Sequence, residues 1–247
     1  MVTKSLIKRI NSLHQKKHRI SDGFFIAEGV KVVQEFLHAG FECEQLLITP
    51  EWKTQFEEKS YLETDKHTFK KISSLVNPSG VLAVFKIPQP AQVVHKGLTV
   101  VLDDVNDPGN LGTIIRLCDW FGVKQLVCSP DTVDCYNPKV VQAAMGSLAR
   151  IEVIYLPLDS FLSESNQIRP SFGTFMNGKN VYQQSFTLDA VLVMGNEANG
   201  IRPETEKRIQ HRIGIPRFGT LQQTESLNVG TATAIFLSEM NRDFTEK

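Results

Sequence analysis

The feature that most constrains the fold is the alternation of apolar runs with helical patterns after residue 98. Runs such as TVVL (99–102) and AVLVM (190–194) do not alternate apolar with polar residues, as expected of strands that are buried on both faces. Between these runs, apolar residues recur every three or four positions, which is the spacing of a helix face. Strands that alternate with helices in this way predict a mainly parallel sheet with helices on both faces.

The same patterns give the expected elements and domains. In the second part of the chain, strands are predicted in LTVVLDD, QLVCS, RIEVIYL, AVLVMG and RIGIPR, and helices over residues 112–121, 138–148, 203–209 and 228–241. In the first part, helices are predicted in SLIKRINSLH, VKVVQEFLHAG and FKKISSL, and strands in FFIAEG, CEQLLIT and VLAVFKI. The stretch PQPAQVVHKG carries prolines and a glycine and is typical of a linker. The predicted domains are therefore residues 1–92 and 97–247.

Charge and cysteine content narrow the class of protein. The formal net charge is zero, but residues 1–20 hold six lysines and arginines and no acidic residue. Such a run is either a solvated helix face or a surface for nucleic-acid phosphates. None of the four cysteines forms a CxxC pair, so we expect no metal site. The chain shows neither a signal-peptide pattern nor an apolar run of membrane-spanning length, so we expect a cytoplasmic protein with no membrane partner.

Three polar stretches follow predicted strands: DDVNDPGNLGTIIR (103–116), MGNEANGI (194–201) and IPRFGTLQQTESLNVG (215–230). Ligands of parallel α/β sheets bind beyond the carboxyl ends of the strands, so we expect these stretches to meet at one edge. The first stretch contains neither GxGxxG nor GxxxxGK[ST], which argues against a nucleotide-dependent oxidoreductase and against a phosphate-loop ATPase. Ser226 has no GxSxG frame, which argues against a serine hydrolase.

Each polar residue in these stretches has a structural interpretation beside the functional one. Asn110 and Asn228 are suited to cap helices, and Ser226 is another possible cap. Arg116 lies off the apolar stripe of its predicted helix and is suited to a surface ion pair or to a substrate contact. Glu197 is placed to bind a hydroxyl group, to hold Arg116 or to cap the helix that begins near residue 203. Taken singly, none of these residues decides between the two interpretations.

Taken together, the three stretches resemble the three motifs of the SpoU-type (TrmH-like) RNA ribose 2′-O-methyltransferases of the SPOUT superfamily. The resemblance extends over about residues 98–239, and YNPKVVQAAMGSL (136–148) also fits it. Residues 24–35 and 77–84 resemble the small ribosomal-protein-like α/β substrate-binding domain of the same family. The resemblance implies an α/β fold whose mainly parallel sheet ends in a C-terminal trefoil knot. It also implies a homodimer that binds S-adenosyl-L-methionine and RNA.

The resemblance further implies roles for individual residues. The implied catalytic residues are Arg116, Asn110, Glu197, Ser226 and Asn228. The implied cofactor-binding residues are Thr174, Gly178, Met194, Gly195, Ile215 and Leu227. Contacts with RNA are expected from the basic N-terminal residues Lys8, Arg9, Lys16, Lys17 and Arg19, together with Lys139.

The implied reaction is methyl transfer to a ribose 2′-hydroxyl. Because a separate domain begins with a basic helix, ribosomal RNA is the expected substrate; transfer RNA is the alternative, as is a non-catalytic RNA-binding protein of the same fold. Arginine stays protonated at neutral pH, which favours Arg116 as a group that holds a phosphate or the developing oxyanion over Arg116 as a base. Two departures from the family pattern are Gln142, where a basic residue is common, and a longer stretch over residues 217–225, which shapes the cofactor loop.

Overall fold

The structure is a computed structural model that describes residues 2–57, 59–221 and 226–244. The chain divides into two compact units. The first unit contains Met1–Gln89 and Asp134–Arg150, and the second contains Pro90–Val133 and Ile151–Lys247. The sequence led us to expect an uninterrupted second domain over residues 97–247. That domain stays a prediction; in the folded chain, the segment Asp134–Arg150 belongs to the first compact unit.

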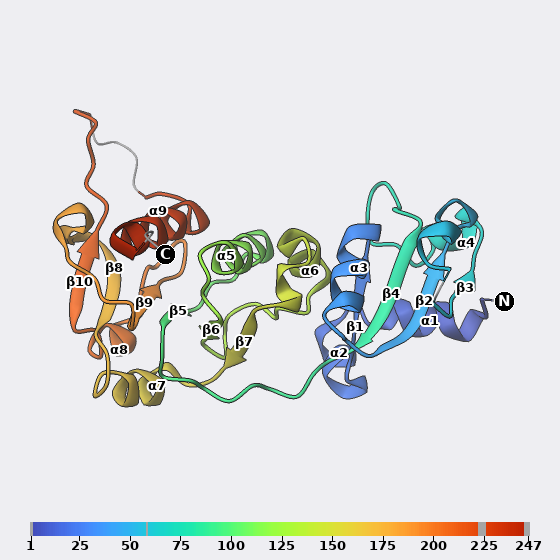
Figure 1. The fold of residues 1–247 in the computed structure, drawn as a ribbon, viewed down its shortest axis with the longest axis horizontal. Helices are drawn as coiled ribbons and strands as arrows, with labels where there is room; N and C mark the ends of the chain where they lie inside the picture. Colours follow the sequence, from blue (N-terminus) through green and yellow to red (C-terminus); the bar gives the residue numbers. More distant parts are fainter. Residues whose placement is uncertain (1, 58, 222–225, 245–247) are drawn as a thin grey trace. The chain divides into compact units, whose positions relative to one another are not determined.

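The first unit is a mixed four-stranded sheet with helices (Figure 1). Its elements are α1 (Lys4–Ser12), α2 (Lys16–Asp22), β1 (Phe24–Glu28), α3 (Val30–His38), β2 (Cys43–Ile48), η1 (Pro50–Gln55), β3 (Leu62–Glu63), α4 (Lys66–Lys70), β4 (Val81–Lys86), α6 (Pro138–Ala144) and η2 (Ser147–Ala149). The strand order is β1-β4-β2-β3, with β4 antiparallel to both of its neighbours. The strands predicted in FFIAEG, CEQLLIT and VLAVFKI correspond to β1, β2 and β4.

The alternation of side chains along β1 and β4 gives this sheet two apolar faces. On one face, Ile26 and Leu82 join a buried cluster that includes Ile10 of α1 and Phe69 of α4. On the other face, Phe25 and Phe85 pack against Phe36 of α3. Both faces of the small sheet are therefore covered.

The segment Asp134–Arg150 joins the first unit through a buried ion pair and an aromatic contact. The Tyr136 ring lies 4.6 Å from the Phe25 ring, centroid to centroid. The Arg19 guanidinium is buried and donates to Asp134 Oδ2 over 2.9 and 2.6 Å and to the Leu13 carbonyl over 2.9 Å. These contacts hold the segment in the first compact unit.

The second unit is a six-stranded sheet of order β10-β8-β9-β5-β6-β7, in which every pair is parallel. Its elements are β5 (Leu98–Leu102), α5 (Pro108–Trp120), β6 (Gln125–Cys128), β7 (Glu152–Tyr155), α7 (Leu158–Ser165), β8 (Ser171–Asn180), η3 (Val181–Gln183), β9 (Ala190–Met194), α8 (Pro203–Glu206), β10 (His211–Gly214), α9 (Val229–Asn241) and η4 (Arg242–Phe244). Figure 1 shows α5 and α9 on one face of the sheet and α7 and α8 on the other. The predicted α/β architecture with a mainly parallel sheet is confirmed.

Four elements of this unit were not predicted, namely α7, β8 and the short 3-10 helices η3 and η4. The predicted linker also lies on this unit: the Gln125 side chain accepts from the Val94 N–H and donates to the Gln92 carbonyl, each over 2.9 Å. Within the described part of the chain, no helix is long and apolar enough to cross a membrane.

Candidate active site

Three connections leave the carboxyl edge of the parallel sheet: β5 to α5, β9 to α8, and β10 to α9. The ends of β5 and β9 are joined by a hydrogen bond of 2.9 Å from the Asp103 N–H to the Met194 carbonyl. Helices α5 and α9, which begin at this edge, pack against each other on one face of the sheet (Figure 1). The polar stretches predicted to meet at one edge therefore do so.

A chain of side-chain hydrogen bonds links the three connections. The Asn110 amide donates to Glu197 Oε1 over 2.8 Å. The Asn228 amide donates to Asn110 Oδ1, also over 2.8 Å. Because both ends of the Asn110 amide are engaged, its orientation is fixed. The second carboxylate oxygen, Glu197 Oε2, has no hydrogen bond to any described residue.

The capping interpretations are now settled residue by residue. Asp107 caps α5, since its carboxylate accepts from the Asn110 N–H over 2.8 Å. The Asn110 side chain is therefore free for the site. Asn228 does both, because it caps α9 through Thr231 and also reaches Asn110. Glu197 does not cap α8, whose N-cap residue is Arg202.

Arg116 lies on the exposed side of α5. It makes no ion pair or hydrogen bond with any residue that the structure describes, so the interpretation as a surface salt bridge is not supported. A guanidinium without an internal partner keeps its full set of donors for an anionic ligand. Arg116 thus differs from the hydrogen-bonded Asn110, Glu197 and Asn228.

The connection that carries Glu197 is anchored at both ends by residues that the sequence analysis missed. At one end, the Asn196 amide donates to the Asp104 carbonyl over 2.6 Å. At the other end, the Arg202 guanidinium donates to the fully buried Asp103 carboxylate over 2.7 and 2.6 Å. Asp103 directly follows β5, and that position is the signal by which sequence inspection could have found it; Arg202 directly precedes α8 and carries no comparable signal.

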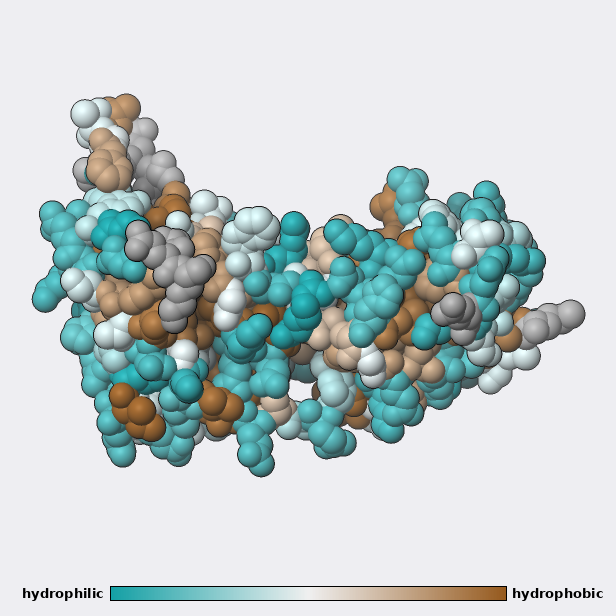
Figure 2. All heavy atoms as spheres, viewed as in Figure 1, coloured by the Kyte–Doolittle hydropathy of each residue, from teal (hydrophilic) through white to brown (hydrophobic). Residues whose placement is uncertain are grey.

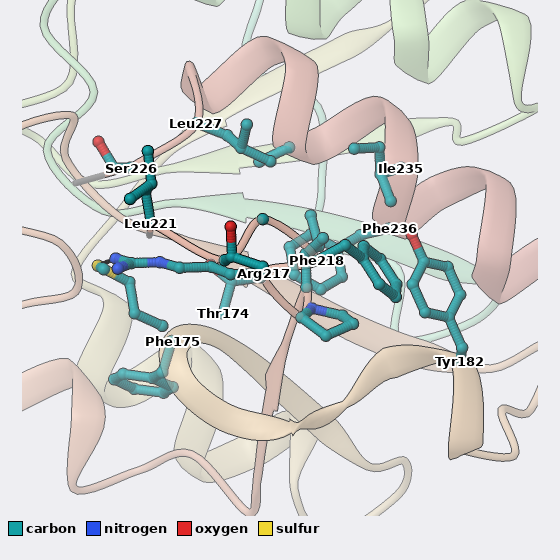
Figure 3. A pocket seen from close by; sticks show the side chains of 16 residues that line it. Thr174, Phe175, Tyr182, Arg217, Phe218, Leu221, Ser226, Leu227, Ile235 and Phe236 are labelled. Atoms are coloured by element: carbon teal, nitrogen blue, oxygen red, sulfur yellow. Dashed lines mark hydrogen bonds between the residues drawn. The ribbon is translucent and has the colours of Figure 1, made fainter. Parts of the chain in front are cut away.

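A pocket of about 840 Å³ lies beside this chain of hydrogen bonds. Of the predicted cofactor residues, Thr174, Ile215 and Leu227 line it, and so does Ser226. Figure 3 shows Leu227 and Ile235 on the α9 side, with Phe218, Phe236 and Tyr182 gathered at one end. Ser226 and Leu227 line the pocket and directly precede Asn228, so the pocket adjoins the hydrogen-bonded chain through this segment.

A shift in strand register opens the floor of the pocket. Arg212 pairs with Gly173, whereas Ile213 pairs with Lys179, so the part of β8 between these partners is released from β10. Three released residues, Thr174, Phe175 and Met176, line the pocket. The irregularity in β8 therefore forms the pocket surface.

The other predicted cofactor residues have packing roles and do not line this pocket. A Cβ on Gly178 would lie 2.2 Å from the Ile213 carbonyl carbon, and one on Gly195 would lie 2.2 Å from that of Gly200. Only glycine allows these close approaches. Met194 is buried, and its carbonyl accepts from Asp103.

The loop between β10 and α9 exposes large apolar side chains before residue 222. The exposed fraction is 82% for Phe218 and 78% for Leu221. Figure 2 shows apolar surface on this projecting segment. The remainder of the long stretch over 217–225, from residue 222 on, lies outside the described residues.

The predicted RNA contacts in the first unit differ in how exposed their side chains are. Arg19 is only 1% exposed and is held by Asp134, so the structure assigns it a structural role in place of the expected RNA contact. Arg9 pairs with Glu44 over 2.8 Å but is still partly exposed. The remaining predicted RNA contacts are exposed; they are Lys8, Lys16, Lys17 and Lys139.

Comparison with known proteins agrees with this architecture. The model of the SpoU rRNA methylase family matches residues 97–238, and the model of the MRM3-like substrate-binding domain matches residues 4–83. A curated relative, the 23S rRNA (guanosine(2553)-2′-O)-methyltransferase RlmP of Bacillus subtilis, is 28% identical over 236 residues, covering 94% of each chain.

Two solved structures are similar over nearly the whole chain. A Porphyromonas gingivalis protein assigned to the TrmH family of RNA methyltransferases has a TM-score of 0.90 at 36% identity, covering 98% of this chain and 99% of the other. An AdoMet-bound rRNA methyltransferase from Sinorhizobium meliloti has a TM-score of 0.87 at 28% identity, covering 100% and 97%. The chain therefore belongs to the SpoU rRNA methylase family.

Proposed function

We propose that the chain transfers a methyl group from S-adenosyl-L-methionine to a ribose 2′-hydroxyl of ribosomal RNA. The observation that carries the proposal is the hydrogen-bonded chain Glu197–Asn110–Asn228 beside a large pocket and an exposed arginine. The names of the relatives support the reaction and the substrate: RlmP acts on 23S rRNA, and the similar Sinorhizobium meliloti enzyme is AdoMet-bound.

The pocket fits such a cofactor in size and chemistry. Small-molecule sites typically measure about 300–1,000 Å³ and are mainly apolar, with a few polar groups. The pocket lies in this range at about 840 Å³, and most of its side chains are apolar. Thr174, Ile215 and Leu227 would hold the cofactor directly, while Gly178, Met194 and Gly195 would shape the backbone around it. When bound, the cofactor supplies an electrophilic methyl group on its sulfonium sulfur.

As the hydroxyl oxygen is methylated, its proton passes to solvent water, and the protein residues have to orient the hydroxyl group and stabilise its developing negative charge. Arg116 carries the positive charge for this, toward either the oxyanion or the adjoining phosphate. Glu197 and Asn228 fix the Asn110 amide, and the three together orient the ribose. Ser226 lies where the pocket meets this chain and positions the ribose from the cofactor side.

Substrate binding is assigned to the first unit. Lys8, Lys16, Lys17 and Lys139 are exposed and suited to phosphate contacts. Arg9 can contribute from its partly exposed position. The match of residues 4–83 to a substrate-binding domain supports this assignment. Gln142 is half-buried, and the lack of a cation there weakens one phosphate contact.

Three further properties belong to the proposal. The family similarity over residues 97–238 supports a trefoil knot at the C-terminal end of the parallel sheet. It also supports a homodimer formed through that domain. A ribosomal RNA substrate would place the protein in the cytoplasm.

The test is methyl transfer to ribosomal RNA from a strain that lacks this protein, followed by mapping of 2′-O-methyl groups. We expect one methylated site with the wild-type protein. Arg116→Ala should abolish transfer while cofactor binding, measured by calorimetry, survives, because Arg116 does not line the pocket. Full activity of Arg116→Ala would overturn the role of Arg116, and absence of transfer by the wild-type protein would overturn the proposed function.

A further inference from the structure

Trp120, at the end of α5, is 84% exposed. The chain has two tryptophans, and the other, Trp52, donates its indole N–H to the Ser79 carbonyl over 3.0 Å. Trp120 makes no hydrogen bond, ring contact or cation–π contact with any described residue. A large aromatic ring kept in water contributes little to folding and is therefore available to a ligand.

Trp120 shares one face of α5 with Arg116. Gly109, Thr113, Arg116 and Trp120 follow at intervals of four, three and four residues, which places them on one side of the helix, and all four are exposed. Arg116 and Trp120 are about 6 Å apart along the helix axis. Asn110, the residue after Gly109, lies in the first turn of the same helix, so the N-terminal end of this face is next to the proposed active site.

The charges on this face suit a nucleic acid. Arg116 lies on this face, and Lys124 follows the end of the helix. Both are exposed, and neither has an ion pair among the residues described. A stable subunit interface, by contrast, has a core of several clustered apolar side chains. In the described residues of α5 and α9, Trp120 is the only large apolar side chain that is exposed. One isolated ring one helical turn from an exposed arginine is a combination that binds stacked bases and phosphates.

We infer that this face of α5 binds single-stranded RNA next to the methylated nucleotide, with Trp120 stacked on a flanking base. Arg116 then holds the phosphate between that base and the reacting ribose. Proteins recognise unpaired RNA by stacking bases on aromatic side chains and by contacting phosphates with cations. The inference rests on the proposed function, and it adds a residue that selects the sequence context.

The test compares Trp120→Ala, Trp120→Leu and Trp120→Phe in the full chain, with unmethylated ribosomal RNA as the substrate. Loss of one stacked base should raise the KM for RNA by about 5-fold to 150-fold in Trp120→Ala. Trp120→Phe, which keeps an aromatic face, should stay within about 3-fold of wild type. Trp120→Leu should resemble Trp120→Ala, because leucine is apolar but has no π-face.

The controls separate RNA binding from folding and from cofactor binding. Cofactor affinity and melting temperature should not change, since Trp120 is exposed and does not line the pocket. Ile168→Ala is the matched control: Ile168 is 66% exposed and follows α7, on the other face of the sheet. It should leave the KM for RNA unchanged.

Tryptophan fluorescence gives a second readout that does not need methyl transfer. Trp52 is the remaining tryptophan in Trp120→Phe, so quenching by a 20-nucleotide single-stranded RNA of mixed sequence should appear in wild type and be lost in this variant. A wild-type KM for Trp120→Ala, or full rescue by leucine, would overturn the inference. A shift of Trp120→Ala to a smaller species in sedimentation would assign Trp120 to a subunit contact and overturn it as well. If wild type transfers no methyl group, the proposed function fails, whereas the quenching still decides whether Trp120 contacts RNA.

Discussion

Two arginines, one in each unit, differ in whether their guanidinium groups have partners. In the first unit, Arg19 is buried, and its guanidinium is occupied by Asp134 and by a backbone carbonyl. In the second unit, Arg116 is exposed and without a partner among the residues described. The sequence marked both arginines as functional. The difference shows that a basic residue in a suggestive pattern identifies a ligand contact only when its donors are free.

The largest expected effect concerns Arg19, the buried and paired arginine. Asp134→Ala leaves the Arg19 guanidinium buried without its counter-ion, and breaking a buried pair in this way costs about 3–5 kcal/mol. The free energy of unfolding, measured by urea denaturation, should fall by this amount. Arg116→Ala removes an exposed side chain and should change the free energy of unfolding by no more than about 0.5 kcal/mol.

A double variant sharpens the same comparison. Arg19→Met with Asp134→Asn removes both charges, and replacing a buried pair by neutral side chains is often nearly neutral for stability. We therefore expect the double variant to be more stable than Asp134→Ala. Equal stability of Asp134→Ala and wild type would show that Asp134 does not stabilise Arg19.

The next effect concerns catalysis at the carboxyl edge of the parallel sheet. Glu197→Ala removes the acceptor that orients the Asn110 amide, and misplacing a reacting group by about 1 Å can lower the rate by about 100-fold. The kcat for methyl transfer should fall by about that factor, with cofactor affinity unchanged. Glu197→Gln keeps an oxygen that can accept the same bond, so it should retain more activity than Glu197→Ala. Equal kcat values for Glu197→Ala and wild type would exclude the orienting role.

Much of the fold follows from local patterns. The strands of both sheets that carry continuous apolar runs, such as β4, β5 and β9, were predicted from sequence. Strand β8 was not, because SFGTFMNGKN contains two glycines and several polar residues. Its register shift against β10 depends on how two distant segments pair, and local periodicity does not record such pairing.

Prediction of the site from sequence is limited in the same way, because local patterns do not record contacts between distant residues. Asn110, Glu197 and Asn228 were identified by motif, and their positions after strands predicted that they would meet. The partners Asp103 and Arg202 are 99 residues apart, and their pairing appears only in the folded chain. The loss of Arg19 from the RNA contacts has the same cause, since its partner Asp134 is 115 residues away. Sequence patterns give residue types at an edge, whereas tertiary contacts decide which of them remain free.

The smallest expected effect tests whether the exposed lysines of the first unit are available to contact RNA, as proposed for Arg116. Lys8→Ala and Lys16→Ala should each weaken RNA binding modestly and reduce the slope of log affinity against log salt by about one, because each removes one phosphate contact. Arg9→Ala should have a smaller effect, since its guanidinium already pairs with Glu44. Filter binding to unmethylated ribosomal RNA at several salt concentrations measures these slopes. Unchanged slopes in both lysine variants would mean that these lysines, although exposed, form only a solvated helix face, and that exposure by itself does not identify an RNA contact.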